Sequence, residues 1–519
     1  VTEADIMRVY NTYLKGKHAV MTSVVPKGQL DLAVAESKEA TVWIEEVKQD
    51  VANEEVSQGE EAVYEKTPSK FDRSEPDFGK LPVFKAPAIW KGKLENGMAL
   101  YGIENNEVPL VQFDITIPGG QLLDPKGKEG VSNLFSDLMM QGTKTKTAAD
   151  LEEAIGLLGA NINMYSANED FHITGSCLTK NLDETIKLVK EIILEPRWDA
   201  SEFSRLKQAL ETSLKGSEAN PNAIASNVFN QLMYGKDNRF GINSSGTLQS
   251  TKDITMEDLK AYYHNLSPKD ATFHIAGAIN KTQTIAALSP LKAWKGETIN
   301  VPTLAVQSTD AAGTLYFVDV PDAKQSVLYI GKLALSGKDE NANNLDFANE
   351  ILGGGSSGRL FQTLRIGKGY TYGAYSGITN REAVSPFAIR TSVRANATLK
   401  SLEIIKNMVK DYKESFTDTE VELTKNKILK GNTRAYESLG AQLGILRRIS
   451  KYNKADNFLD TDQDELLSMS LEDYQTIIDQ YLKESEMVYL VVGDKATQFE
   501  EVKQLGKPVV QLDIYGNKI

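Results

Sequence analysis

The sequence contains a single cysteine and only four histidines, and both shortages exclude kinds of chemistry. One cysteine, Cys177, cannot form a disulfide within the chain or a thiolate cluster for a metal. It lies in an alternating apolar run that is typical of a buried strand, so we expect an inert core thiol. No apolar run approaches the roughly 18 residues that a membrane-spanning helix needs, so no membrane span is expected.

Basic residues are outnumbered by acidic ones, and the formal net charge is −13. Nucleic-acid phosphates would be repelled by this charge, so nucleic acid is not expected as a partner. The charge is compatible with cationic peptides and equally with solubility alone. The 519 residues are enough for two or three domains with full cores. No signal peptide is visible, and the compartment stays open, a periplasmic or other exported location included.

One pattern occurs three times along the chain. A Ser or Thr is followed three residues later by an acid, then by an apolar stripe of helical period and a short apolar strand. The hydroxyl and the acid can cap a helix reciprocally, as in a capping box. The pairs are Thr2 with Asp5, Thr255 with Asp258, and Ser470 with Asp473.

A second internal match supports this repeat. The segment that begins at Phe171 aligns with the segment that begins at Phe387, an offset of 216 residues, against 215 for the capping-box helices. We therefore predict two tandem homologous domains of about 215 residues, at 85–300 and 301–519. Residues 1–28 contain only the last helix and strand of the repeat, and we interpret them as the closing helix and strand of an upstream domain.

The composition changes between these parts. Residues 45–65 carry eight acids against one lysine, without a sustained amphipathic period. We interpret residues 29–84 as a solvated acidic linker. An acidic binding motif is the alternative.

Local signals predict the fold class. Asn96-Gly97 between two strand-like runs is a hairpin signal, and alternation resumes at residues 111–117. Helical patterns follow at residues 130–140, 182–194 and 203–214. The order indicates an α+β fold in which each domain has a mainly antiparallel sheet with helices packed on one face.

The run Leu94-x-Asn96-Gly97 and the later Gly119-Gly120, Gly130-Val131 and Gln141-Gly142 resemble domains of the pitrilysin/insulinase family of inverted-motif zinc metallopeptidases. In active members, a helix carries H-x-x-E-H, whose histidines bind zinc and whose glutamate is the general base. The matching residues here are Asn133, Leu134, Phe135, Ser136 and Asp137.

The resemblance therefore implies that this chain binds no metal. No two of the histidines have i,i+4 spacing, and we interpret all four as structural. Glu211 is the position that corresponds to the family's further zinc ligand, but without histidines it has no site to complete. The four histidines are His18, His172, His264 and His274.

Residues 352–373 resemble the family's signature for the half opposite the zinc. They contain a glycine-rich turn, then Arg359-Leu360, Leu364-Arg365, and Lys368-Gly369 shortly before Tyr372. Gly358 stands where the family often has serine. In the family, the arginine and the tyrosine seven residues later reach substrate bound at the zinc of the other half. The resemblance maps these catalytic and substrate-binding roles onto Arg365 and Tyr372.

The implied function is the C-terminal, non-zinc half of a clamshell zinc metallopeptidase that encloses peptide substrates. The zinc and the H-x-x-E-H motif are expected in a partner half, either upstream polypeptide or a separate subunit, and this chain alone is expected to be inactive. Two alternatives stay open. One is a proteolytically silent structural homologue, and the other is a module that binds extended peptides along a sheet edge without catalysis.

Overall fold

The computed structural model describes residues 2–38, 68–72, 77, 79–82, 86–304 and 311–519. The chain divides into two units, Val1–Glu60 and Glu61–Ile519, and each is described on its own. The acidic segment 45–65, predicted to be a solvated linker, lies outside the described residues.

Unit 1 begins with helix α1 (Glu3–Tyr13), as the capping-box pattern predicts. The Thr2 hydroxyl accepts the backbone N–H of Asp5 at 3.3 Å, and the Asp5 carboxylate accepts the backbone N–H of Thr2 at 2.9 Å. Within residues 2–38, however, no strand follows α1, although the sequence pattern predicts one. An extended segment becomes a strand only when a neighbouring strand pairs with its backbone N–H and C=O groups.

The first domain of unit 2 (residues 86–304) is built on a six-stranded sheet in the order β1-β2-β6-β3-β5-β4. β1 and β2 form the predicted hairpin, and Gly97 in its turn has a φ of 101°, which favours glycine. β2 and β6 run parallel, and the other neighbours run antiparallel. The strands are β1 (Ile89–Lys93), β2 (Ala99–Glu104), β3 (Leu110–Pro118), β4 (Asn161–Ser166), β5 (Asp170–Leu178) and β6 (Thr272–Gly277).

The second domain (residues 311–519) repeats this plan with the order β12-β7-β11-β8-β10-β9. β7 is parallel to both β11 and β12, and the remaining pairs are antiparallel. β11 therefore takes the place that β6 takes in the first domain. The strands are β7 (Leu315–Asp319), β8 (Gln325–Leu335), β9 (Thr371–Ile378), β10 (Ser385–Arg394), β11 (Val488–Gly493) and β12 (Val509–Leu512).

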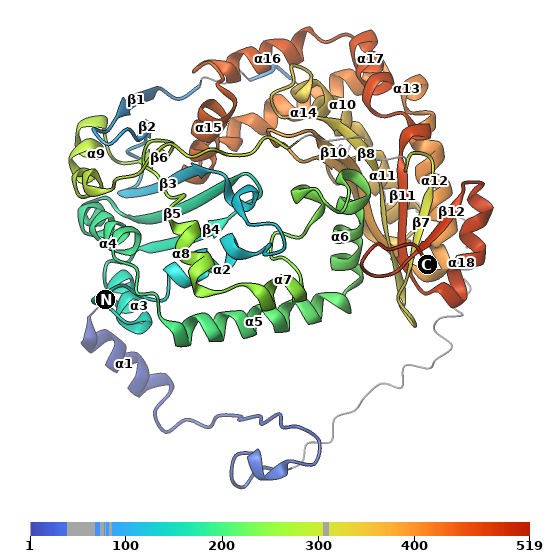
Figure 1. The fold of residues 1–519 in the computed structure, drawn as a ribbon. Coiled ribbons are helices and arrows are strands. Elements are labelled where there is room, and N and C mark those ends of the chain that lie inside the picture. Colours follow the sequence, from blue (N-terminus) through green and yellow to red (C-terminus); the bar gives the residue numbers. More distant parts are fainter. Residues whose placement is uncertain (1, 39–67, 73–76, 78, 83–85, 305–310) are drawn as a thin grey trace. The chain divides into compact units, whose positions relative to one another are not determined.

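Helices pack against both sheets (Figure 1). The predicted capping boxes are present at the starts of α8 and α17. The helices of the first domain are α2 (Val131–Met139), α3 (Ala148–Leu157), α4 (Leu182–Leu194), α5 (Ala200–Glu218), α6 (Pro221–Tyr234), α7 (Leu248–Asp253), α8 (Met256–Tyr263) and α9 (Lys281–Ala287). Those of the second domain are α10 (Ala342–Gly353), α11 (Arg359–Phe361), α12 (Thr398–Lys410), α13 (Tyr412–Ser415), α14 (Asp418–Ala435), α15 (Leu439–Tyr452), α16 (Phe458–Ser468), α17 (Leu471–Tyr481) and α18 (Lys495–Val502).

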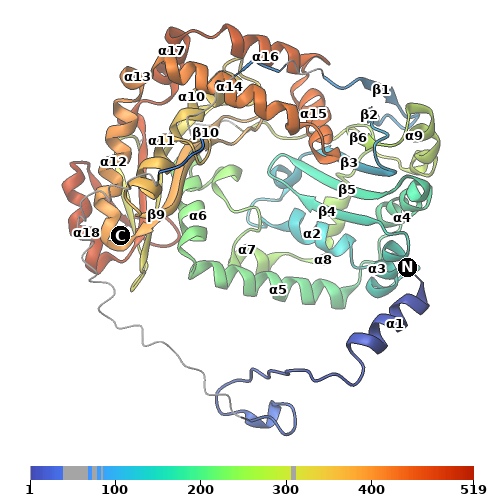
Figure 2. The ribbon, with the colours of Figure 1, turned by 180° about the vertical axis from the view of Figure 1, so that it is seen from behind.

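The two domains exchange one helix each, which the sequence does not predict. α6 of the first domain packs on β8 and β11 of the second sheet, where Val228 and Phe229 are fully buried. α15 of the second domain packs on β2, β3 and β6 of the first sheet. The view from behind shows both helices beside the sheet of the other domain (Figure 2). Each sheet is thus also covered on its second face, by a helix from its neighbour.

The first domain's own core lies between its sheet and its own helices. Alternate residues of β3 and β6 enter it, including Phe113, Ile115, Phe273 and Ile275. The free thiol of Cys177 is buried in the same core, as expected. Among the described residues, no helix combines the length and the apolar character that crossing a bilayer requires.

Candidate functional site

The structure places Arg365 and Tyr372 side by side in the second domain. Arg365 lies in a π-helical segment (Gln362–Gly367) that follows α11, and Tyr372 is the second residue of β9. The Arg365 guanidinium donates a hydrogen bond of 2.7 Å from Nη1 to the backbone carbonyl of Tyr372. Its central carbon lies 5.5 Å from the centroid of the Tyr372 ring. The seven-residue spacing therefore brings the arginine over the tyrosine, since the chain reverses between them.

Two further rings extend this contact into a row. The Arg365 guanidinium carbon also lies 5.6 Å from the ring centroid of Phe361, and the Phe361 and Tyr375 rings are 5.6 Å apart. We call Tyr372, Arg365, Phe361 and Tyr375 the aromatic row. The Tyr372 side chain is 83% exposed and that of Tyr375 is 46% exposed. The row thus presents ring faces, a cation and two hydroxyl groups to solvent.

The aromatic row borders an open sheet edge. β9 is the last strand of its sheet and pairs only with β10 among the described strands. An edge strand exposes backbone N–H and C=O groups that can pair with a further extended chain. A peptide added along β9 would therefore pass next to Arg365 and Tyr372.

The glycine-rich turn supports this edge and is not a phosphate cradle. Gly353 ends α10 and packs directly against β9, so that a Cβ there would lie 2.6 Å from the backbone nitrogen of Ser376. The Asn349 amide donates to the carbonyl of Ser376 at 2.9 Å. Arg359, at the start of α11, forms an ion pair with Glu420 at 2.7 Å. These contacts fix the strand and the helix that carry the aromatic row.

The positions that match the family's zinc motif lie on α2. Asp124 caps this helix, because its carboxylate accepts the backbone N–H groups of Gly130 and Ser132, both at 2.8 Å. Burial raises the pKa of Asp124 to about 6, although these two hydrogen bonds oppose the rise. Along the helix, Asn133 is half-buried and Asp137 is exposed, one turn apart on one face.

The side chains on α2 do not fit a zinc ion. The Asn133 amide donates to the Ser245 hydroxyl at 3.0 Å, and the Ser136 hydroxyl donates to the Asn133 carbonyl at 2.7 Å. Of the motif positions and Glu211 on α5, only Asp137 and Glu211 carry an anionic oxygen, whereas zinc prefers imidazole and thiolate together with carboxylates. Within the described ranges, no group of three or more His, Cys, Asp or Glu side chains could hold a metal. We therefore assign no step of any reaction to a metal held by this chain.

Two family models match the chain. Residues 102–239 match the model described as insulinase, peptidase family M16, and residues 253–428 match the model described as the peptidase M16 inactive domain. Together the two matches span more than half of the chain. The chain belongs to the insulinase family, M16. It is a family member that lacks the zinc site, because α2 has Asn133, Ser136 and Asp137 in the positions of the histidines and the glutamate.

Similar M16 proteins occur in several bacteria. A Helicobacter pylori protein named non-peptidase homolog YmxG is 22% identical over 398 residues, which cover 76% of this chain and 91% of that protein. A Bacillus subtilis protein named uncharacterized zinc protease YmxG is 22% identical over 362 residues, which cover 67% of this chain and 85% of that protein. The names differ on whether such relatives are peptidases.

Solved structures show the same M16 fold. A crystal structure of a peptidase M16 inactive domain from Pseudomonas fluorescens superposes with a TM-score of 0.72 at 21% identity, over 78% of this chain and 98% of that one. A protease structure from Helicobacter pylori has a TM-score of 0.71 at 18% identity, over 78% and 99% of the two chains. At these identities the structures support the fold and not the activity.

The structure of this M16 chain also shows a charged cluster that sequence reasoning missed. It lies on the face of the first sheet that α15 covers. Asp114 on β3 is fully buried and contacts His172 on β5 at 3.1 Å and Arg447 on α15 at 2.8 Å. The sequence carried no signal for it, because Asp114 occupies a polar position in the alternation of residues 111–117.

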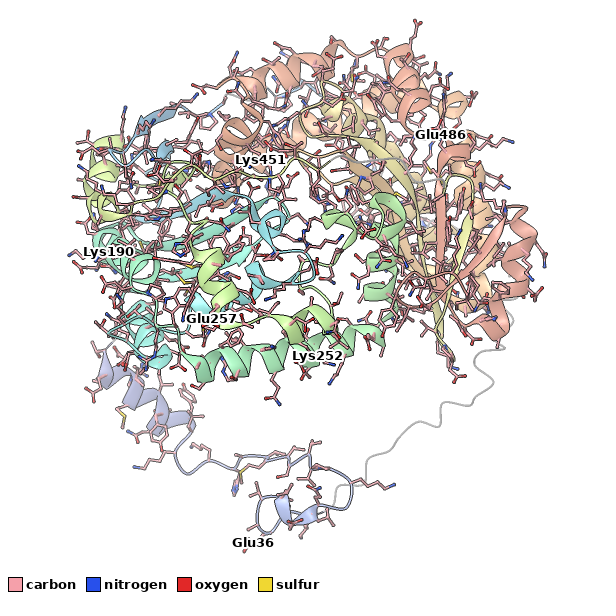
Figure 3. The ribbon with its side chains drawn as sticks, in the orientation of Figure 1. Glu36, Lys190, Lys252, Glu257, Lys451 and Glu486 are labelled. Carbon is pink, nitrogen blue, oxygen red and sulfur yellow. The ribbon has the colours of Figure 1, made fainter. Side chains whose placement is uncertain are left out.

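Oppositely charged partners offset the effect of burial on the pKa values of this cluster. Burial alone would raise the pKa of Asp114, but the hydrogen bond and charge of His172 hold it below its usual value. Lys451, labelled in Figure 3, pairs with Glu169 at 2.9 Å and with Asp170. Burial alone would lower the pKa of Lys451, but the two carboxylates outweigh it and raise the pKa. Arg447 and Lys451 of the second domain thus pair with carboxylates of the first domain, and these ion pairs join the two domains.

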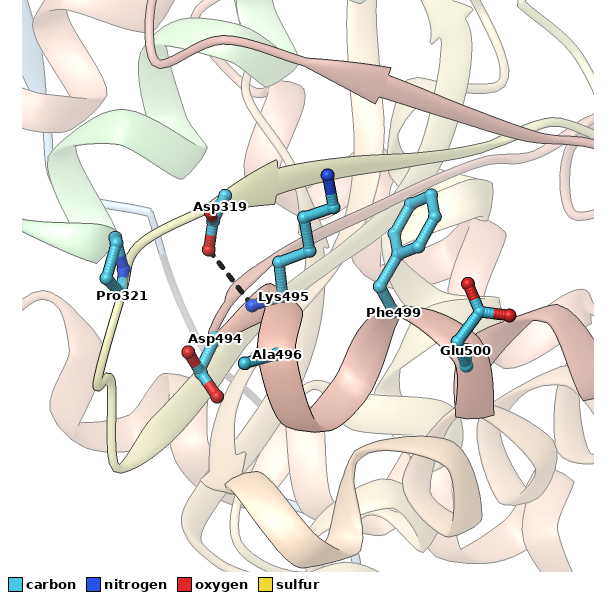
Figure 4. A pocket seen from close by; sticks show the side chains of 7 residues that line it. All are labelled: Asp319, Pro321, Asp494, Lys495, Ala496, Phe499 and Glu500. Atoms are coloured by element: carbon cyan, nitrogen blue, oxygen red, sulfur yellow. Dashed lines mark hydrogen bonds between the residues drawn. The ribbon is translucent and has the colours of Figure 1, made fainter.

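A separate pocket of about 320 Å³ lies at the carboxyl ends of the parallel strands β7 and β11 (Figure 4). Its polar groups already have partners: Asp319 accepts the backbone N–H of Lys495 at 2.9 Å, and Asp494 caps α18. None of the aromatic-row residues lines it. It therefore adds nothing to the candidate site.

Proposed function

We propose that this chain is the substrate-holding, non-zinc half of a two-part M16 peptidase. The observation that carries the proposal is the Arg365–Tyr372 pair, with its guanidinium held by the Tyr372 carbonyl and its tyrosine ring in solvent beside the free edge of β9. The Tyr372 ring is largely exposed and lies against the Arg365 guanidinium, so it adds little to the core and needs another reason to be held there. Peptide binding is such a reason.

The chemistry of the two side chains fits a peptide backbone. A guanidinium is always charged and offers five N–H donors in a planar fork, of which Arg365 uses one on its own chain. Its other donors can bind a carbonyl of an extended peptide. The Tyr372 hydroxyl can donate to the carbonyl oxygen that gains negative charge when a peptide bond is cleaved. Arg365 would thus bind substrate, and Tyr372 would also stabilise the transition state.

The partner half would supply the metal chemistry. Zinc and an H-x-x-E-H motif are proposed there, since α2 of this chain does not fit a zinc ion. This chain would contribute binding, orientation of the scissile carbonyl, and exclusion of water around the enclosed peptide. Without the partner, it is expected to cleave no peptide.

The test uses the assembled enzyme with Arg365→Ala or Tyr372→Phe. Loss of one oxyanion donor lowers the rate by about a hundredfold to a thousandfold. Tyr372→Phe keeps the ring, so kcat should fall while KM stays nearly constant. Arg365→Ala should lower kcat/KM and raise KM as well. Arg434→Ala and Tyr515→Phe are matched controls, because both residues are exposed and lie outside the aromatic row and its strand.

A proteolytically silent structural homologue is the second candidate function. The loss of all three zinc-motif side chains favours it, and so does the non-peptidase name of the Helicobacter pylori relative. Wild-type kinetics in both variants would remove the pair from the mechanism and leave this second function. Binding of a labelled extended peptide by the isolated chain, weakened by Arg365→Ala but without cleavage, would instead identify a peptide-binding module.

A further inference from the structure

Within unit 1, no described residue covers the apolar face of helix α1. Ile6, Tyr13 and Leu14 are 61%, 67% and 65% exposed. Soluble proteins rarely leave a continuous apolar stripe of this kind uncovered, and such stripes mark interaction surfaces. The internal repeat offers a buried counterpart for comparison.

α17 of the second domain is the structural counterpart of α1. Each helix has 11 residues, begins with a capping box, and ends at a leucine in the C-cap position. Position by position, Ile6, Tyr13 and Leu14 correspond to Tyr474, Tyr481 and Leu482. Those three side chains are only 0%, 8% and 1% exposed. The same positions are thus buried in α17 and open in α1.

The polar faces of the two helices agree as well. Arg8, Asn11 and Thr12 are exposed in α1, and their counterparts in α17 are also exposed. The change from exposed to fully buried lies on the apolar face of α1. This pattern is expected of a helix that is folded but has not met the surface that it packs on.

The residues after α1 correspond to β11 in the same register. Residues 20–25 match Val488–Gly493, a strand that is buried along its whole length between β7 and β8. Val20 and Val24 are 97% and 94% exposed, and no strand is formed there. A central strand cannot form until the strands on both sides of it are present.

We propose that residues 2–25 complete the sheet of another insulinase-type domain. α1 packs on that domain as α17 packs here, and residues 20–25 enter its sheet as a central strand, parallel to one neighbour and antiparallel to the other. The acceptor is a five-stranded sheet that lacks this strand. It is not a second copy of this chain, because both sheets of unit 2 already contain their central strands, β6 and β11. The inference is independent of the proposed peptide site.

A chimera tests the inference without the partner. In the full chain, residues 470–493 are replaced by residues 2–25, a segment of the same length. We expect a cooperative melting transition and retained amide protection in β7 and β8. A control with residues 2–25 in shuffled order should lose both.

Because Thr22 and Ser23 replace Leu490 and Val491 in that core, a second chimera carries Thr22→Leu and Ser23→Val in the inserted copy. If both chimeras lose cooperative folding as the shuffled control does, the segment is not a counterpart of α17 and β11, and the inference is wrong.

Photo-crosslinking identifies the acceptor. The full chain, expressed in its source cells, carries benzoylphenylalanine in place of Tyr10 on the apolar face or Thr12 on the polar face. We expect crosslinking from position 10 to an insulinase-type domain outside residues 61–519, with at least tenfold less from position 12. Crosslinks to residues 61–519, to a second copy or to unrelated proteins, or no crosslink at all, would overturn the proposal. None of these outcomes depends on Arg365 or Tyr372.

Discussion

Arg447 on α15 donates a hydrogen bond of 2.8 Å to the carboxylate of Asp114 on β3, across the boundary between the two domains of unit 2. Asp114 has no exposed surface, and its other carboxylate contact is the imidazole of His172. A buried carboxylate is tolerated only when charged or hydrogen-bonding partners replace its water. The second domain therefore supplies one of the two side chains that compensate the burial of the Asp114 carboxylate.

The first prediction follows from this pair. Arg447→Met keeps most of the aliphatic stem but removes the charge, and Asp114 keeps His172 as a partner. We expect the free energy of unfolding to fall by roughly 1.5–3 kcal/mol, the range for a lost hydrogen bond to a charged group. Urea unfolding measures it, with the exposed Arg434→Met on α14 as the control. Equal stability of the two variants would show that Arg447 contributes little to this interface.

The second prediction concerns pH and His274, which lies beside Asp114 on β6. Burial lowers the pKa of His274 to about 4, whereas an unfolded histidine titrates near 6.5. Between these values the unfolded chain binds a proton that the folded chain does not, so stability falls as the pH falls from 6.5 to 4. Between pH 7.5 and 5, this residue alone should account for a loss on the order of 2 kcal/mol.

A comparison with His274→Gln isolates this contribution. Other buried groups act in the opposite direction, because burial raises the pKa of Asp124 and Asp346 to about 6, and each of these adds stability as the pH falls below 6. Glutamine can still bond Ser450, which contacts His274 Nε2 at 2.7 Å. The variant should lose less stability than the wild type between pH 7.5 and 5. A parallel pH dependence in both proteins would contradict the assignment.

Much of the fold follows from local sequence signals. The capping boxes at Thr2, Thr255 and Ser470, the Asn96-Gly97 hairpin and α4 were predictable because each depends on residues close together in the chain. The pairing of Arg365 with Tyr372 followed from a motif resemblance, and the structure supplies the reversal of the chain that brings them together. The roles of the two residues stay a prediction.

The helix exchange could not be predicted in the same way. An apolar stripe on α6 shows that one face is buried but not which sheet covers it, because burial depends on tertiary contacts far along the chain. The same limit applies to Asp114. The alternation of its strand does not show that an arginine 333 positions away is its partner. For the strand predicted after α1, the local sequence is strand-like but no strand is formed. No neighbouring strand that could pair with it is described in unit 1.

The third prediction concerns metal. The isolated chain, washed with chelator and dialysed against zinc, should hold well below one zinc per chain, because Asn133 and Ser136 bond to protein groups and offer no imidazole. Metal analysis by mass spectrometry measures it. The double variant Asn133→His/Asp137→His places two imidazoles one turn apart and should raise zinc content, whereas stoichiometric zinc in the wild type would contradict our interpretation of α2.

The last prediction concerns the exchanged helix α6. Phe229 belongs to the first domain in sequence, but its fully buried ring packs edge-on against Tyr329 on β8, with centroids 5.5 Å apart. Phe229→Ala should cost about 3–5 kcal/mol, as for other buried phenylalanines. Native-state hydrogen exchange should show the loss of protection first in β8 and β11, since local openings report the contacts that are weakened.

The matched control for that prediction is Leu151→Ala on α3, a buried residue in the first domain's own core. It should lower protection first in the first sheet, where α3 contacts β4. If Phe229→Ala instead loosened the first sheet before the second, α6 would stabilise the domain that contains its sequence. If Phe229→Ala lowers protection first in the second sheet and Leu151→Ala first in the first sheet, the second sheet depends on a helix encoded before residue 300, and the second domain does not carry all the residues that its own core requires.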